Sequence, residues 1–279
     1  MNMPLAPPFS RLMLSTEATS FDAGAERVAL EFAQRCGLPL HVVLPFISNA
    51  EAELVAPELQ QRAESALAAR LERLREAARD RGVSATGTIR LGEDGVAGIL
   101  DEARAAGADL IVMRRRGKRG FLAKLLVGEM VLQVIERAPC HALLVPTAAR
   151  WWTQRVLLAS DGSPDSRRAA QLAACLARCC GLPLSVIAAP ERCETGSAAA
   201  QERLASALAS LAQSGIAAQG CLGAGRPGEA ILEAARRFRA DLIVLGRRGG
   251  GAHARRASLG SAAQEVAGGA DCPVLIARA

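Results

Sequence analysis

The second half of the chain alternates short apolar runs with longer stretches of helical character. The apolar runs predict strands, at 155–160, 184–189, 216–222, 241–245 and 273–277. The stretches between them predict helices, from 164 to about 181 and at about 198–213, 227–238 and 260–267. Ser163 followed by Pro164 is typical of a helix start, with the serine as the cap. Continuous apolar strands that alternate with helices indicate a parallel sheet covered on both faces.

The first half of the chain repeats the second. Cys-Gly-Leu-Pro-Leu at 36–40 recurs at 180–184, which is 144 positions later. Ala-Asp-Leu-Ile-Val at 108–112 recurs at 240–244, which is 132 positions later. Self-similarity of this kind indicates that one structural unit occurs twice. Two copies of one α/β domain in tandem are therefore the simplest account of the chain.

The two copies differ in their middle, where the second is 12 residues shorter. The first copy carries there an Ala-, Glu- and Arg-rich stretch that predicts a long helix from about 51 to 81. The linker between the copies, at 146–154, is short and contains Trp151 and Trp152.

Composition narrows the classes of partner. The 279 residues are 50% hydrophobic and 22% charged, an ordinary balance for globular domains, and each half is long enough to bury a core. The formal charge of +6 favours anionic partners such as phosphates. Nucleic acid is not expected as a partner, because six Phe, two Trp and no Tyr leave little for a base-stacking surface.

The eight cysteines include no CxxC pair and no zinc-type spacing, so no metal site is expected. They are interpreted as small buried residues in a reducing compartment. No signal-peptide pattern opens the chain and no apolar run is long enough to span a bilayer. A cytoplasmic protein without a membrane partner is therefore expected.

A glycine-rich loop follows the fourth predicted strand of the second copy. Gly246, Gly249 and Gly250 lie at its start, and Gly260 and Ser261 open the next helix. Glycines let a backbone approach an anion closely, and the first N–H groups of a helix favour phosphate. A flexible Gly/Arg loop before an ordinary helix start is the alternative, and the pattern alone does not separate the two.

Together with Asp161 at the end of the first strand and Cys-Pro-Val-Leu-Ile at 272–276, this loop resembles that of a universal stress protein of the ATP-binding type. In that family the pattern is Gly-x2-Gly-x9-Gly-Ser/Thr. The resemblance covers both halves. It implies two doubly wound, five-stranded parallel-sheet domains, Rossmann-like and similar to adenine nucleotide α-hydrolases, at 1–147 and 154–279.

The resemblance also implies a ligand, ATP, with Mg²⁺ as a possible companion. Gly246, Gly249, Gly260 and Ser261 would hold the phosphates and ribose, Asp161 would lie near the nucleoside, and Ala189 would lie beside the adenine. The full set of residues expected to bind the nucleotide is Ala159, Asp161, Ala189, Gly246, Arg247, Gly249, Gly250, Gly260 and Ser261.

The second copy departs from the family pattern at one point. Ten residues, not nine, separate Gly249 from Gly260. Either Gly250 takes the role of the second glycine or the loop carries a one-residue bulge.

The first copy departs much further. Arg114 stands where the second copy has Gly246, Glu17 where it has Asp161, and Glu129 where it has Ser261. A degenerate nucleotide site is therefore expected in the first domain, so that ATP would bind only the second.

Other patterns fit less well. Gly-Ala-Gly-Arg-Pro-Gly at 223–228 matches GxGxxG but follows the third strand, not the first, so a dinucleotide site is not expected. The dense basic residues of the two loops are Arg114, Arg115, Arg116, Lys118, Arg119, Arg247, Arg248, Arg255 and Arg256. They could hold a triphosphate, contact nucleic acid or be solvated without a ligand. No nucleophile–base arrangement involving His41, His141 or His253 is evident.

The leading hypothesis is a stress-response protein that binds ATP or another adenine nucleotide in its second domain. It would act as a regulatory or interaction module with, at most, slow ATPase activity. The alternatives are a nucleotide-free scaffold with relic glycine loops and an enzyme that uses an adenylate or dinucleotide cofactor. The family also implies that strands at 142–145 and 274–277 pair edge to edge, giving an internal pseudo-dimer that could assemble further into a homodimer of chains.

Overall fold

The computed structural model describes residues 7–48, 57–115, 128–188, 198–250 and 258–279. The first half forms five strands, β1 (Leu12–Ser15), β2 (Leu40–Ile47), β3 (Ala85–Gly92), β4 (Leu110–Arg114) and β5 (His141–Val145). Its helices are η1 (Ser20–Asp22), α1 (Ala23–Cys36), α3 (Pro57–Arg79), α4 (Gly95–Ala105) and α5 (Glu129–Arg137).

The second half repeats this succession. Its strands are β6 (Val156–Ser160), β7 (Leu184–Ala188), β8 (Ala218–Leu222), β9 (Leu242–Gly246) and β10 (Val274–Ala277). Its helices are α6 (Pro164–Cys180), α7 (Ala198–Gln213), α8 (Pro227–Phe238) and α9 (Ser261–Gly269). The alternation of strand and helix expected from the hydrophobic pattern is confirmed in both halves.

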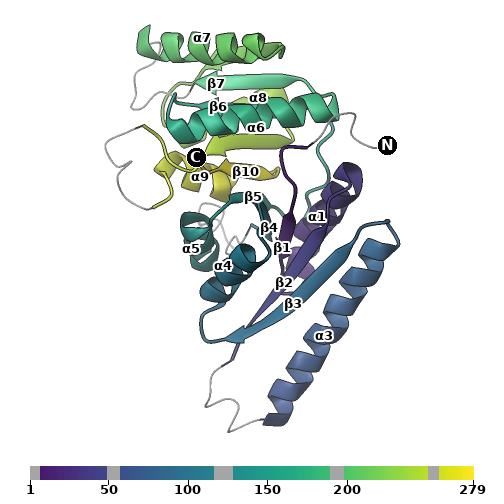
Figure 1. Ribbon diagram of the computed structural model, residues 1–279. Coiled ribbons are helices and arrows are strands. Elements are labelled where there is room, and N and C mark those ends of the chain that lie inside the picture. The colour runs from purple at the N-terminus through teal and green to yellow at the C-terminus, as the bar shows by residue number, and fades with distance from the viewer. Residues whose placement is uncertain (1–6, 49–56, 116–127, 189–197, 251–257) are drawn as a thin grey trace.

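All ten strands belong to one sheet, in the order β3-β2-β1-β4-β5-β10-β9-β6-β7-β8. Neighbouring strands are parallel within each half. The two halves meet at β5 and β10, which pair antiparallel with Leu143 opposite Leu275 (Figure 1). The predicted edge-to-edge pairing, and with it the internal pseudo-dimer, is confirmed.

Local sequence signals account for the helix ends. The Ser163 side chain accepts a hydrogen bond from the backbone N–H of Ser166, and Pro164 occupies the first turn of α6. Gly181 ends the same helix in the left-handed conformation, with φ of 65°, as Gly37 ends α1 with φ of 64°. The repeated Cys-Gly-Leu-Pro-Leu motif is therefore a helix end followed by a strand.

Helices cover both faces of the sheet, and each face has one apolar core that runs through both halves. One core contains buried side chains of α1, α3, α6 and α7, together with Trp151 and Trp152 of the linker. The other contains buried side chains of α4, α5, α8 and α9. Because neither core stops at the boundary between the halves, the two copies pack as one three-layer unit.

The linker tryptophans strengthen this junction. Trp151 and Trp152 stack with ring centroids 3.9 Å apart, and both meet the ring of Phe32 edge to face, at 5.3 and 5.6 Å. Trp152 is 1% exposed. The segment that joins the two copies is thus part of the core.

We expect Trp152→Ala to lower the free energy of unfolding by about 3–5 kcal/mol, because it removes a fully buried indole and leaves a cavity. The shared cores predict that both halves of the wild type unfold in one transition, which urea titrations followed by far-UV circular dichroism and by fluorescence of the two linker tryptophans would detect. Two separate transitions in the wild-type protein would contradict this expectation.

A histidine at the same junction makes stability depend on pH. His141 begins β5, is buried, and accepts a hydrogen bond at Nδ1 from the backbone N–H of Arg278, 3.0 Å away. Burial lowers the pKa of His141 to about 4, and the positive charge of Arg168 acts in the same direction. The folded protein therefore needs the neutral imidazole.

We expect His141 to contribute stability fully above about pH 6.5, the ordinary pKa of an unfolded histidine, and to lose it as pH falls toward 4. In that window the unfolded chain binds the extra proton more tightly. His141→Gln keeps a polar side chain at this position but cannot be protonated. The urea midpoint of unfolding should fall between about pH 7 and about pH 5 in both proteins, and this fall should be larger in the wild type than in the variant. Equal falls would show that other groups cause the acid sensitivity.

Candidate functional site

The predicted loop of the second copy lies at the carboxyl ends of β6 and β9, which are neighbours in the sheet. From there the chain continues from β6 to β7 on one side and from β9 to β10 on the other. This is the point at which the strand order reverses, where open α/β sheets bind ligands. The N-terminal ends of α6 and α9 follow the same two strands.

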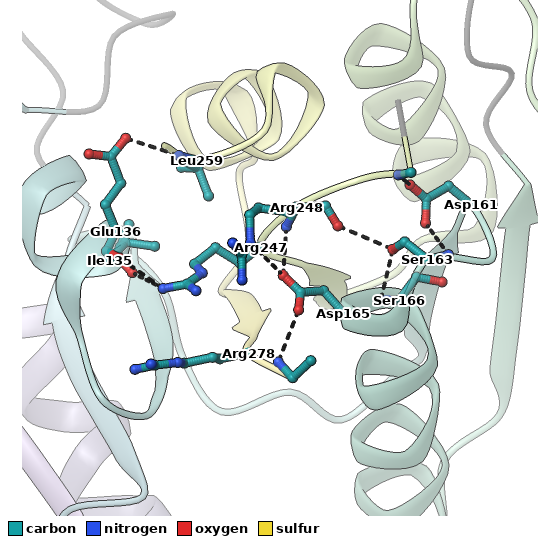
Figure 2. A network of polar contacts seen from close by, with 12 residues as sticks. Ile135, Glu136, Asp161, Ser163, Asp165, Ser166, Arg247, Arg248, Leu259 and Arg278 are labelled. Carbon is teal, nitrogen blue, oxygen red and sulfur yellow. Dashed lines mark hydrogen bonds and ion pairs between the residues drawn. The ribbon is translucent and has the colours of Figure 1, made fainter. Parts of the chain in front are cut away.

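The structure brings the two ends of the glycine loop together. The N–H of Gly260 donates to the carbonyl of Arg247, at 2.9 Å, and so closes the neck of the loop. Asp161 accepts from the N–H of Gly250 at 2.9 Å through Oδ2 and from the N–H of Ser163 at 3.0 Å through Oδ1 (Figure 2). The structure thus brings Asp161, Gly250 and Gly260 together at the two ends of this loop.

Close packing explains two of the glycines. A Cβ on Gly246 would lie 2.8 Å from the backbone nitrogen of Ser166, so this residue must lack a side chain for β9 to meet the start of α6. A Cβ on Gly249 would lie 2.6 Å from Oδ2 of Asp161. Gly260 is different, because its φ of −61° suits other residues and a Cβ there would make ordinary van der Waals contacts, the nearest at 3.4 Å to the carbonyl oxygen of Arg247. It precedes Ser261, the exposed first residue of α9.

The sequence reasoning missed Asp165. This carboxylate is 4% exposed and accepts from the N–H of Arg248 and from the N–H of Ala279, both at 3.0 Å. Ser163 adds a hydrogen bond from its hydroxyl to the carbonyl of Arg248, at 3.1 Å. The Ser-Pro-Asp motif therefore does more than start α6, because its side chains also hold the first part of the loop.

The structure corrects the expectation for Arg247. Its guanidinium does not turn toward Asp161 but reaches the first domain, where Nη1 donates to the carbonyl of Glu136 at 2.8 Å (Figure 2). The residue is 7% exposed. Arg115, its counterpart in the repeat, donates in the same way to the carbonyls of Gly268 and Ala270. Each domain thus places an arginine on the negative end of a helix in the other, and the Arg247 side chain belongs to the interface.

Ala159 and Ala189 were also expected to bind the nucleotide. Ala159 is buried in β6, 7% exposed, and packs in the core that contains α8 and α9. Ala189, expected beside the adenine, lies outside the described residues, as do His253, Arg255 and Arg256 of the loop.

In the first domain, Arg114 occupies the position that corresponds to Gly246 of the second. This side chain donates to Glu17 Oε2 at 2.5 Å and to Thr19 Oγ1 at 3.1 Å, and its Nε lies 3.3 Å from Asp22 Oδ1. The cavity that remains beside Glu17, Asp22 and Arg114 has a volume of about 10 Å³, which is the room that one water molecule needs. Known small-molecule pockets are some thirtyfold larger or more.

Glu129 starts α5 as Ser261 starts α9. Its Oε1 accepts from Gln133 at 3.4 Å, whereas Arg114 pairs with Glu17 and Asp22. The short helix η1 stands where the second copy already has the first turn of α6. The acids that hold Arg114 are Asp22 of this rebuilt segment and Glu17, which follows β1, and the sequence alone did not indicate the pairing.

Within the described ranges, no group of three or more His, Cys, Asp or Glu side chains could hold a metal ion. None of the helices described there is both long enough and apolar enough to cross a membrane.

Comparison with known proteins agrees with this architecture. The sequence model of the Universal stress protein family matches twice, at residues 9–146 and 153–278. A universal stress protein encoded in the QAH/OAS sulfhydrylase 3′ region of Thermus aquaticus is 40% identical over 134 residues, 44% of this chain and 97% of that protein.

Two solved structures match along nearly the whole length. A universal stress protein from Archaeoglobus fulgidus is 22% identical with a TM-score of 0.74, covering 96% of both chains. A putative universal stress protein from Pseudomonas aeruginosa is 20% identical with a TM-score of 0.71, covering 97% of this chain and 93% of that one. These likenesses concern the fold. The double match of the family model, which spans nearly the whole chain, establishes that this chain belongs to the universal stress protein family and contains two of its domains in tandem.

Proposed function

We propose that the second domain binds ATP, or another adenine nucleotide, and that the ligand regulates the protein's interactions. The observation that carries the proposal is the meeting of Asp161, Gly250 and Gly260 at the switch point of strand order, directly before the N-terminus of α9. Helix N-termini and glycine backbones are suited to phosphate groups.

Each part of the site has a role in this proposal. The first N–H groups of α9 and the Ser261 hydroxyl would bind phosphate oxygens. Both oxygens of Asp161 already accept one backbone N–H each, and a carboxylate has about four acceptor positions, so it can also accept from a ribose hydroxyl. Mg²⁺ would enter with the phosphates, which commonly supply several of its ligands.

The first domain would not bind nucleotide in this proposal. Arg114 occupies the position of Gly246 and is neutralised by Glu17 and Asp22. Glu129 adds a negative charge where Ser261 offers a hydroxyl. The second domain would then bind the ligand, and the first would support the second structurally.

We expect Ser261→Glu and Gly260→Glu each to abolish ATP binding. At about 4 Å two unit charges repel by roughly 4 kcal/mol at an effective dielectric near 20, which corresponds to about a thousandfold in affinity, and even a third of that costs about tenfold. Folding should change little, because an acidic residue suits a helix N-terminus and the backbone of Gly260 accepts a side chain. Isothermal titration calorimetry with MgATP measures the loss.

Ser261→Ala is the matched control for the added charge. It removes one hydroxyl donor and should weaken binding by about tenfold or less. If both glutamate variants bind ATP like the wild type, phosphate does not lie at this helix start and the proposed site is wrong. If the wild type itself neither titrates with MgATP nor carries nucleotide in native mass spectrometry, a nucleotide-free scaffold replaces the proposal.

The asymmetry predicts one ATP for each chain. Calorimetry on the full chain should give a stoichiometry near one, and Gly260→Glu should remove the only binding signal. Glu129→Ser, which gives the first domain the residue of the second at this helix start, should leave the stoichiometry near one, because Arg114 still fills the cavity. Two sites of similar affinity, or a site that survives Gly260→Glu, would refute the asymmetry.

A further inference from the structure

The end of α5, which belongs to the first domain, contacts the nucleotide loop of the second. Glu136 Oε1 accepts from the N–H of Leu259 at 2.9 Å, and the Glu136 carbonyl accepts from Nη1 of Arg247 at 2.8 Å (Figure 2). Arg247 and Gly260 in turn form the neck of the loop through their backbone hydrogen bond of 2.9 Å. One residue of the first domain therefore holds both sides of the neck.

The carboxylate contact has no counterpart across the pseudo-twofold relation. In the repeat the position of Glu136 corresponds to Gly268, which has no side chain. The carbonyl of Gly268 accepts from Arg115, just as the carbonyl of Glu136 accepts from Arg247. The arginine–carbonyl contacts thus join the two domains in both directions. The carboxylate contact runs only from the first domain to the second, whose loop keeps its glycines.

The location of the contact indicates what it does. Leu259 is buried, 6% exposed, and comes directly before Gly260, the residue that caps α9. A charged acceptor on the Leu259 N–H fixes the chain at the point where the loop enters the helix. Loop ends that are fixed before the ligand arrives lose no further freedom on binding, which favours affinity. The guanidinium of Arg247, which is bonded to the Glu136 carbonyl, also makes a favourable charge interaction with the Glu136 carboxylate.

We propose that Glu136 is a positioning residue through which the first domain completes the nucleotide site of the second. It holds the neck of the loop so that the first N–H groups of α9 face the phosphates. The inference rests on the proposed function, and it gives the degenerate first domain a task in ligand binding that does not need a site of its own.

The test uses the full chain and three variants, Glu136→Ala, Glu136→Gln and Arg137→Ala. The glutamine retains an acceptor oxygen for the Leu259 N–H, and Arg137 is the exposed neighbour on the same helix, so its variant controls for changes in α5 itself. Amide hydrogen exchange of residues 258–262 is measured without ligand, and MgATP affinity is measured by calorimetry.

We expect Glu136→Ala to speed exchange of the Leu259 and Gly260 amides and to weaken ATP binding by about five- to tenfold. Glu136→Gln and Arg137→Ala should resemble the wild type in both measurements. The urea midpoint of each variant, compared with that of the wild type, separates a local effect on the loop from a general loss of stability.

Unchanged exchange together with unchanged affinity in Glu136→Ala overturns the inference. So does tighter binding in that variant, because it would mean that the carboxylate only repels the phosphates. If no form of the protein binds MgATP, the proposed function fails, and the exchange of the Leu259 amide alone still decides whether Glu136 holds the loop.

Discussion

The antiparallel pairing of β5 with β10 is the interaction on which the rest of the molecule depends. Each half alone would end in an apolar strand with unpaired backbone groups along one edge, a surface that tends to associate. Pairing the two edges satisfies those groups and makes one ten-stranded sheet. It also aligns the helices on both faces, so that two continuous cores form and the linker tryptophans become buried in one of them.

The same pairing explains why the candidate site lies close to the other domain. Since β5 and β10 are adjacent, the ends of α5 and α9 come within reach of the loops that follow β9 and β4. An arginine side chain is long enough to cross this distance, and Arg115 and Arg247 both do so. The loop that follows β9 is therefore held by Asp165 and Ser163 of its own domain and by Glu136 of the other.

The sequence predicted the repeat, the order of strands and helices, the paired edges and the meeting of Asp161 with the glycine loop, because these follow from hydrophobic periodicity, turn residues and the family motif. It did not predict where long side chains point. Arg247 has the position of a phosphate ligand in the motif, but its guanidinium reaches a helix that is distant in sequence. Arg114 pairs with Glu17 and Asp22, and only the folded chain brings these three together.

The burial of Trp152 within the junction has a consequence for how such a protein changes over generations. When two identical chains form a dimer, every substitution appears in both halves, so a change that suits one site is imposed on the other. Here each half has its own stretch of one chain, and the buried linker keeps the two halves together as neighbours. An arginine at 114 and a glycine at 246 can then coexist in one molecule, and selection acts on each half separately.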